Sequence, residues 1–243
     1  MRIALISDIH ANLPALNAVL DDIRTQGADQ IIFLGDAATL GPYPKETLET
    51  LRALDCICIQ GNHDAALLDL SRANELQIAA PLHPTITWGH SLLTEAEFEF
   101  LRSFHPTYQL DLGGMTMLCF HGSPHSNTDV ILSTTSEEIM DGFFAGQSAD
   151  ILAGGHSHIQ MMRQRGRQIV INPGSVGYAF VEPFRYRGDT PRLLPWAEYA
   201  LVRVEKSGWS AAIHRVPFDA QVVQRAVMAS GSPNKDWWLT QYC

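Results

Sequence analysis

Residues 2–10 read RIALISDIH, a short apolar run that ends in Asp8-Ile9-His10. Its length and composition predict a buried β-strand with metal-binding side chains directly after it. Four later apolar runs end in the same manner, in Asp36, in Asn62-His63, in His121 and in His156-Ser157-His158. Because the carboxyl ends of the strands in an α/β sheet converge on one crevice, we expect all of these side chains to meet there.

The first part of the chain alternates predicted strands with amphipathic helices. Strands are predicted at residues 2–7, 30–35 and 56–60. The first helix follows Asn12, a favoured N-cap residue, and ends before Gly27. A helical insert is predicted at about residues 65–105, near the rim of the crevice, and Thr94 with Glu97 forms a capping box inside it.

The second part of the chain is predicted to be mostly antiparallel. Gly113-Gly114 separates two apolar runs and indicates a hairpin, and residues 198–205 and 209–216 indicate another. Short strands are expected at 151–153 and 168–171, and a tail at about 220–243 begins as a helix. The fold class expected is α/β becoming α+β, with two packed sheets in a single domain over residues 1–243.

Composition limits the function classes. The chain has 243 residues, 46% of them hydrophobic, and a net charge of −9, which disfavours binding to a nucleic-acid polymer. We expect no membrane association, because no apolar stretch approaches the ~20 residues that span a bilayer and no signal-peptide pattern is present. The four cysteines lack disulfide spacing, which favours reduced thiols and a cytoplasmic location.

The polar residues at the strand ends have the chemistry of a two-metal site. Two ions about 3.5–4 Å apart can clamp the attacking and leaving oxygens of a phosphoryl transfer. Mixed carboxylate, amide and imidazole ligands favour Mn²⁺, with Fe, Zn²⁺, Co²⁺ or Ni²⁺ as alternatives, over Mg²⁺ or Ca²⁺. The candidate ligands are Asp8, His10, Asp36, Asn62, His121, His156 and His158.

In order, the motifs D-x-H, G-D, G-N-H-D, H-G and G-H-S-H resemble those of the calcineurin-like metallophosphoesterases. Gly41-Pro42 and Asn172-Pro173-Gly174-Ser175 extend the resemblance to the compact bacterial and archaeal cytosolic branch. The resemblance implies a four-layer αββα sandwich, in which Asp36 is shared by two ions. It assigns Asp8, His10 and His158 to one ion and Asn62, His121 and His156 to the other.

The same resemblance places His63 against the scissile phosphate, with Asp64 orienting it. It implies hydrolysis of a phosphate ester P–O bond by metal-bound hydroxide, with His63 acting as the imidazolium or as a neutral donor. A small phosphodiester or a dinucleoside polyphosphate is the leading substrate, and a phosphomonoester is the runner-up. The residues leave the metal pair and the oligomeric state open.

Two readings from other classes compete with this one. A non-catalytic scaffold of the same fold is disfavoured, because His63 and every ligand position are present. A DNA nuclease is disfavoured by the acidic composition. Residues 178–196 are longer than expected for the compact branch, and His83, His90 and His125 have no assigned role; a metal or phosphate contact for these histidines is less favoured than a structural one.

Overall fold

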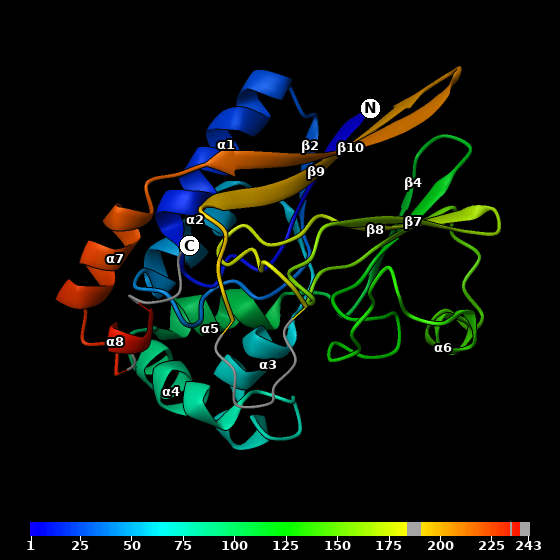
Figure 1. Cartoon of the computed structure of the whole chain (residues 1–243). Helices are drawn as coiled ribbons and strands as arrows, with labels where there is room; N and C mark the ends of the chain where they lie inside the picture. The colour runs from blue at the N-terminus through cyan, green and yellow to red at the C-terminus, as the bar shows by residue number, and fades with distance from the viewer. Residues whose placement is uncertain (184–190, 234, 239–243) are drawn as a thin grey trace.

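The computed structural model describes residues 1–183, 191–233 and 235–238, apart from the side chains of Trp237 and Trp238. Two mixed five-stranded sheets form its centre (Figure 1). Residues 184–190, which belong to the segment 178–196 that is longer than expected for the compact branch, lie outside the described residues. Phe180 and Leu193 form an isolated antiparallel bridge at the base of that segment.

The first sheet has the strand order β10-β9-β1-β2-β3. Its strands are β1 (Arg2–Ile6), β2 (Gln30–Phe33), β3 (Ile57–Cys58), β9 (Trp196–Glu205) and β10 (Gly208–Pro217). β1 pairs in parallel with β2 and antiparallel with β9, so the N-terminal strand lies in the middle of the sheet. The predicted hairpin near the C-terminus is confirmed as β9 and β10.

The second sheet has the strand order β4-β5-β6-β8-β7. Its strands are β4 (Tyr108–Asp111), β5 (Thr116–Cys119), β6 (Ile151–Ala153), β7 (Met161–Arg165) and β8 (Gln168–Asn172). β5, β6 and β8 are parallel, while β4 and β7 are antiparallel edge strands. The predicted turn at Gly113-Gly114 is confirmed, since it joins β4 to β5.

Helices cover the outer face of each sheet. The α-helices are α1 (Leu13–Gln26), α2 (Pro44–Ala53), α3 (Asn62–Leu68), α4 (His83–Ser91), α5 (Glu95–Arg102), α6 (Glu137–Phe143), α7 (Ala220–Ala229) and α8 (Lys235–Trp238). Two short 3₁₀ segments, Leu70–Arg72 and Ala80–Leu82, lie in the predicted insert. Figure 1 shows α1 and α2 beside the first sheet and α6 beside the second.

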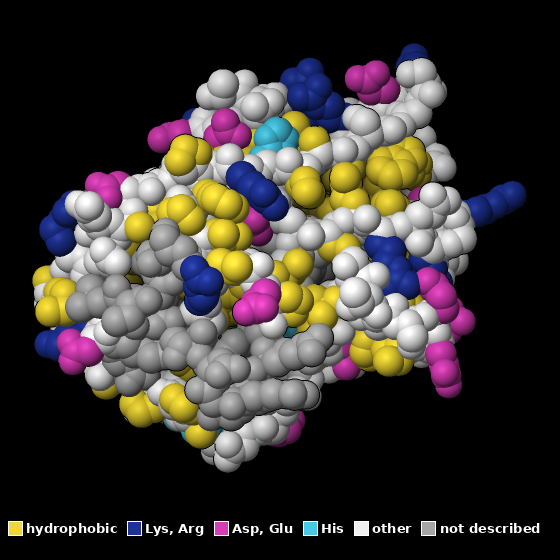
Figure 2. Space-filling view, viewed as in Figure 1, with side chains coloured by type: hydrophobic (Ala, Val, Ile, Leu, Met, Phe, Trp, Pro, Cys, Tyr) yellow, Lys and Arg dark blue, Asp and Glu magenta, His cyan; other side chains and the backbone are white. Residues whose placement is uncertain are grey.

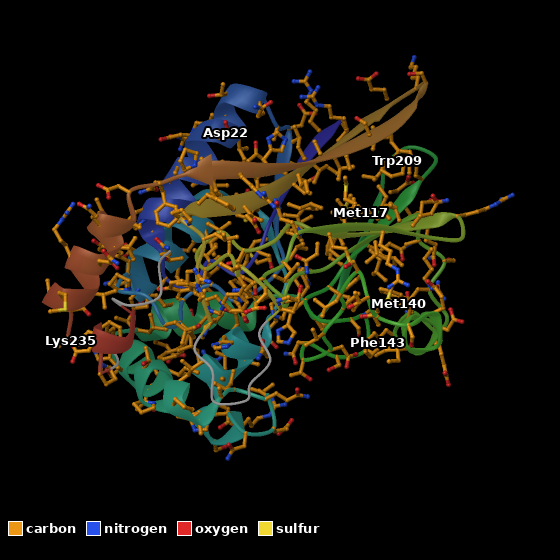
Figure 3. The ribbon with its side chains drawn as sticks, in the orientation of Figure 1. Asp22, Met117, Met140, Phe143, Trp209 and Lys235 are labelled. Atoms are coloured by element: carbon orange, nitrogen blue, oxygen red, sulfur yellow. The ribbon has the colours of Figure 1, made fainter. Side chains whose placement is uncertain are left out.

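Alternation along β1 explains the layering. Ala4 and Ile6 point into the apolar cluster beneath the helices of the first sheet, whereas Ile3 and Leu5 point into the cluster between the two sheets. Met117 faces the same intersheet cluster, and Met140 of α6 lies in a third cluster on the outer face of the second sheet (Figure 3). These three apolar interfaces define four layers, helix–sheet–sheet–helix, and confirm the expected fold class.

Local signals at helix ends behave as predicted. The Asn12 side chain accepts the N–H of Ala15 at 3.2 Å, and Gly27 has a left-handed φ of 73° at the end of α1. Thr94 donates its backbone N–H to Glu97 at 2.8 Å, which confirms the capping box of α5. Both caps satisfy backbone groups that a helix end would otherwise leave unpaired.

Two segments differ from the sequence-based expectation. Residues 161–165 form strand β7, which is not among the strands expected from the sequence. The side chains of Arg163 and Arg165 on this edge strand form ion pairs with Glu137 and Asp141. Both acidic residues lie on α6, a helix that was also not predicted. Alternating polar residues on an exposed edge strand carry little apolar signal, so periodicity alone does not reveal β7.

The visible surface carries no concentrated basic patch. On the face in Figure 2, Lys and Arg side chains are scattered among acidic and apolar ones. Among the described residues, no helix has the length and apolarity needed to cross a bilayer.

Candidate metal centre

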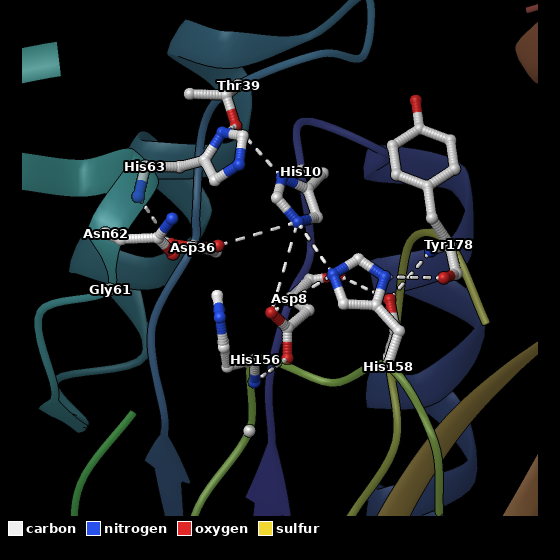
Figure 4. A network of polar contacts seen from close by, with 12 residues as sticks. Asp8, His10, Asp36, Thr39, Gly61, Asn62, His63, His156, His158 and Tyr178 are labelled. Carbon is white, nitrogen blue, oxygen red and sulfur yellow. Dashed lines mark hydrogen bonds and ion pairs between the residues drawn. The ribbon is translucent and has the colours of Figure 1, made fainter. Parts of the chain in front are cut away.

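The predicted ligands lie in loops at the carboxyl ends of strands from both sheets. Asp8 and His10 follow β1, Asp36 follows β2, and Asn62 begins α3 after β3. The second sheet contributes His121 after β5 and both His156 and His158 after β6. The convergence expected from strand topology therefore occurs, across both sheets of the sandwich (Figure 4).

One group of ligand atoms is formed by Asp8, His10 and His158, whose candidate atoms all lie within 4.8 Å of one another. His158 Nε2 is 3.3 Å from Asp8 Oδ1 and 3.1 Å from His10 Nε2. Two imidazole nitrogens at that separation need a proton or a cation between them, because two lone pairs repel. This group has the donor set of a transition-metal site.

A second group is formed by Asp36, His121 and His156, again with all candidate atoms within 4.8 Å. Asp36 Oδ2 is 3.4 Å from His121 Nε2 and 3.7 Å from His10 Nε2 of the first group. One carboxylate oxygen of Asp36 therefore faces ligands of both groups. This is the geometry required of a carboxylate shared by two ions.

Several candidate ligands form hydrogen bonds to backbone carbonyls through the side-chain atom that points away from the centre. His121 Nδ1 bonds Leu34 O, and His158 Nδ1 bonds Tyr178 O, each at 2.7 Å. The Asn62 amide nitrogen donates to Leu76 O at 3.0 Å, which directs its oxygen toward the centre. Such outer contacts fix the ring tautomer and leave the opposite atom free for a metal.

Three buried atoms at the centre have no hydrogen-bond partner among the described residues: Asp8 Oδ1, Asn62 Oδ1 and His121 Nε2. A buried polar atom without a partner costs about 1–3 kcal/mol. All three are atoms that the sequence assigns to metal binding, and a cation would satisfy each of them. The residues present therefore fit a bound metal.

The titration behaviour of the centre also favours bound positive charge. Burial opposes ionisation, yet the neighbouring His158 holds the pKa of Asp8 at about 2. Burial likewise opposes protonation of His121, but the Asp36 carboxylate raises its pKa to about 9. Burial and the nearby His121 lower the pKa of His156 to about 4, which keeps it in the neutral form that binds metals. Two buried carboxylates thus attract charge that divalent cations would supply.

His63 lies beside the centre, but Asp64 does not contact its ring. The Asp64 carboxylate instead accepts backbone N–H groups from Asp36, Ala37 and Gly61 at 2.7–2.9 Å. Asp64 therefore ties the loop after β2 to the start of α3, and its expected role in orienting His63 stays a prediction. The His63 ring is instead bonded by Thr39, whose Oγ1 lies 3.0 Å from His63 Nδ1.

His63 shares its hydrogen-bond partner with His10, because Thr39 Oγ1 bonds the Nδ1 atom of both rings. With His10 and Asp36 it also forms a third group whose candidate ligand atoms lie within 4.8 Å of one another. Burial lowers the pKa of His63, and the cationic forms of nearby histidines add to that effect against the pull of Asp36. Thr39 carries no sequence signal of its own, because an isolated threonine in a loop fits many roles.

Unusual backbone conformations mark the ligand loops. Asp8, His10, Asp36, His156 and His158 all have φ between 48° and 65°, the left-handed region that non-glycine residues seldom adopt. Such strain persists where the surrounding structure enforces it, and it concentrates at functional sites. Sequence gave no signal for it at these positions.

Close approach of the loops depends on missing side chains. A Cβ at Gly35 would lie 2.5 Å from His121 Nδ1, and one at Gly155 would lie 1.9 Å from Ser7 Oγ. Both positions therefore need glycine. Asn172 adds a tie between loops by donating to Gly155 O at 2.6 Å.

The remaining candidate histidines bond backbone carbonyls away from the centre. His83 Nε2 contacts Ile78 O, His90 Nδ1 contacts Leu67 O, and His125 Nε2 contacts Ala145 O. Within the described part of the chain, these three do not belong to a group of potential metal ligands. A structural role accounts for each of them.

The chain belongs to a known family. Residues 1–187 match the calcineurin-like phosphoesterase superfamily domain, which covers most of the chain. A metallophosphoesterase from Sphaerobacter thermophilus has a similar structure, with a TM-score of 0.75, 26% identity, and coverage of 99% of this chain and 98% of that chain.

Two curated relatives carry functional names. Phosphodiesterase YfcE of Escherichia coli K12 is 28% identical over 186 residues, covering 72% of this chain and 79% of the relative. The symmetrical bis(5'-nucleosyl)-tetraphosphatase of Pseudomonas syringae pv. tomato is 32% identical over 79 residues, covering 31% of this chain and 26% of the relative. The chain is accordingly a phosphoesterase of a metal-dependent family, and its clustered Asp and His residues could hold the metal.

Proposed function

We propose that this protein hydrolyses a small phosphodiester or a dinucleoside polyphosphate at a centre of two divalent transition-metal ions, with Mn²⁺ as the first candidate. The observation that carries the proposal is the cluster of buried Asp, Asn and His side chains at the carboxyl ends of strands from both sheets, three of whose atoms have no hydrogen-bond partner among the described residues. The names of the two curated relatives, a phosphodiesterase and a tetraphosphatase, support this substrate class.

The proposed ligand sets follow the two observed groups. Asp36 is proposed to serve both ions, because its Oδ2 faces ligands of each group. The ions, when bound, would supply an activated water and neutralise charge on the phosphoryl oxygens. The first ion would be held by Asp8, His10, Asp36 and His158, and the second by Asp36, Asn62, His121 and His156.

His63 is proposed to contact the phosphate and to donate a hydrogen bond to the leaving oxygen, either as the imidazolium, which can also give up its proton, or as the neutral ring, which donates the hydrogen bond alone. It is held beside the centre because its backbone N–H donates to Asp36 Oδ1 at 2.9 Å and its Nδ1 bonds Thr39. We assign it to the substrate and not to a metal ion, although it forms a third group of potential ligands with His10 and Asp36. Asp64 is proposed to support the site indirectly, because its carboxylate accepts the backbone N–H groups of Asp36 and Ala37 and so fixes the position of Asp36. No covalent phosphoenzyme is needed.

We also propose that residues 1–243 work as one metallophosphoesterase domain in the cytoplasm. The late strand β9 pairs with β1, so the C-terminal part of the chain completes the sheet that carries Asp8. Cys58 and Cys119 are buried free thiols, which suits a reducing compartment.

A metal-by-substrate screen tests the proposal. Purified protein is stripped with a chelator and reconstituted separately with Mn²⁺, Fe²⁺, Co²⁺, Ni²⁺, Zn²⁺ and Mg²⁺. Each form is assayed on bis-p-nitrophenyl phosphate, p-nitrophenyl phosphate and diadenosine tetraphosphate. We expect metal-dependent hydrolysis of a diester or of the tetraphosphate, and none in Asp36→Asn, which controls for contaminating phosphatases.

Other outcomes of the screen separate the alternatives. Turnover of the monoester alone would replace the diester with the runner-up substrate. Cleavage of a DNA strand faster than of the small diesters would favour the nuclease. A fully metal-loaded protein that cleaves no phosphate ester would contradict catalysis and favour the scaffold.

A further inference from the structure

Thr39 occupies an unusual position between two functional histidines. Its side chain is completely buried, and its Oγ1 lies 2.9 Å from His10 Nδ1 and 3.0 Å from His63 Nδ1 (Figure 4). His10 is a proposed metal ligand, and His63 is the proposed donor to the phosphate. One hydroxyl therefore joins a residue that would bind metal to a residue that would act on substrate.

A hydroxyl has one hydrogen to donate, so its two hydrogen bonds must run in a definite direction. Among the described residues, the two imidazole rings are the partners of the Thr39 hydroxyl. If both Nδ1 atoms carried hydrogen, the Thr39 hydrogen would have no acceptor. If neither did, one ring would receive no hydrogen bond. The favoured state has one ring donating to Thr39 and the other accepting from it.

The surroundings of His10 decide which direction is used. Its Nε2 faces Asp36 Oδ2 at 3.7 Å and His158 Nε2 at 3.1 Å, so Nε2 is the atom directed at the metal centre. A metal-binding nitrogen carries no hydrogen. The hydrogen of His10 is then on Nδ1, and it is donated to Thr39. The Thr39 hydroxyl is left to donate to His63 Nδ1.

We propose that Thr39 is a positioning residue that selects the Nε2–H tautomer of His63 when His10 is in its metal-binding state. His63 then presents an N–H away from Thr39, and its neutral form acts as the hydrogen-bond donor. The reverse direction would place hydrogen on His10 Nε2, which is incompatible with ligation. Metal binding at His10 and donation by His63 are thereby coupled through one side chain. The role of His63 in this coupling rests on the proposed function.

Nitrogen NMR of the histidine rings tests the tautomer directly. Protein labelled with ¹⁵N-histidine is studied with Zn²⁺ bound, since Zn²⁺ is diamagnetic, and the His63 signals are assigned by their absence in His63→Ala. We expect His63 to show the Nε2–H pattern in the parent protein. Thr39→Val keeps the shape and removes the hydroxyl, and it should give a mixture of the two tautomers.

Thr39→Ser is the matched control, because it retains the hydroxyl and should restore the parent pattern. Circular dichroism and elemental analysis establish that each variant is folded and loaded, and Thr39→Ala provides a second hydroxyl-free variant if Thr39→Val does not fold. An unchanged Nε2–H pattern in a folded, loaded variant without the hydroxyl would overturn the proposal. So would an Nδ1–H pattern in the parent protein.

Kinetics separate this inference from the proposed function. Thr39→Val should lower kcat about tenfold or more on a diester with a poor leaving group, and less on a nitrophenyl ester. If the His63 tautomer changes while kcat is unaffected for every substrate, the positioning by Thr39 stands and the assigned role of His63 fails. If kcat falls while the tautomer is unchanged, the inference about Thr39 fails.

Discussion

Replacing Asp36 by asparagine should weaken the binding of both metal ions, whereas replacing Asn62 by alanine should weaken the binding of one. Asp36 Oδ2 lies 3.4 Å from His121 Nε2 and 3.7 Å from His10 Nε2, which belong to different ligand groups. Asn62 contributes a neutral amide oxygen, held by its bond to Leu76 O. Asparagine at position 36 keeps the shape of the side chain and removes its charge from both groups.

The magnitude follows from the charge that is lost. Two unit charges 4 Å apart interact by about 4 kcal/mol at an effective dielectric constant of 20. Rearrangement and water entry recover part of this, so we expect a loss of at least about 2 kcal/mol for each ion, or roughly thirtyfold in each Kd. Asn62→Ala removes a neutral donor and should cost about tenfold at one ion.

Calorimetric titration of metal-free protein with Mn²⁺, combined with elemental analysis, measures both affinities. Asp21→Asn is the matched control, because it makes the same chemical change at an exposed carboxylate on α1. Loss of only one ion from Asp36→Asn, with the other bound at its normal affinity, would refute the shared-carboxylate assignment. Equal metal loss from Asp36→Asn and Asn62→Ala would refute it as well.

Three further outcomes are expected. His63→Ala should lower kcat by ~10²–10⁴ on poor leaving groups and less on nitrophenyl esters, with metal content unchanged; loss of a metal would instead make His63 a ligand. Chelation should lower Tm by about 10–20 °C relative to protein that holds two ions at 100 times their Kd, measured by calorimetry, and Mn²⁺ should restore it; an unchanged Tm would contradict ordered ligation. Burial raises the pKa of Glu198 to about 7 from 4.5, so the folded state binds this proton more tightly and stability falls as pH rises between those values. E198Q should therefore gain about 1–3 kcal/mol over the parent between pH 5 and pH 8 in urea unfolding, while the exposed-site control Glu138→Gln should not.

Sequence predicted the elements whose signals are local or apolar. Asn12 and Thr94 mark helix starts through their own side chains, and the buried strand β1 is an uninterrupted apolar run. The clustering of the candidate metal ligands could be predicted because each follows such a run, and strand topology then brings the ends together.

Other features depend on tertiary contacts that leave no local pattern. β7 is a polar edge strand supported by ion pairs to α6, so its residues lack apolar alternation. The role of Thr39 arises only when loops after β1 and β3 approach it from two sides. The family resemblance gave Asp64 the task of orienting His63, but here its carboxylate accepts the backbone N–H groups of Asp36, Ala37 and Gly61.

The central position of β1 has a consequence for how the chain is made. Its partner β9 ends at Glu205, so one edge of β1 has no final partner until most of the chain has left the ribosome. At about 5–20 residues per second, synthesis from the end of β2 at Phe33 to the end of β9 at Glu205 takes roughly 9–35 s. An open strand edge can pair with other chains, and this one is apolar and directly precedes Asp8. We therefore expect the nascent protein to be most prone to aggregation during this interval, and its candidate ligands can come together only after His158 has emerged.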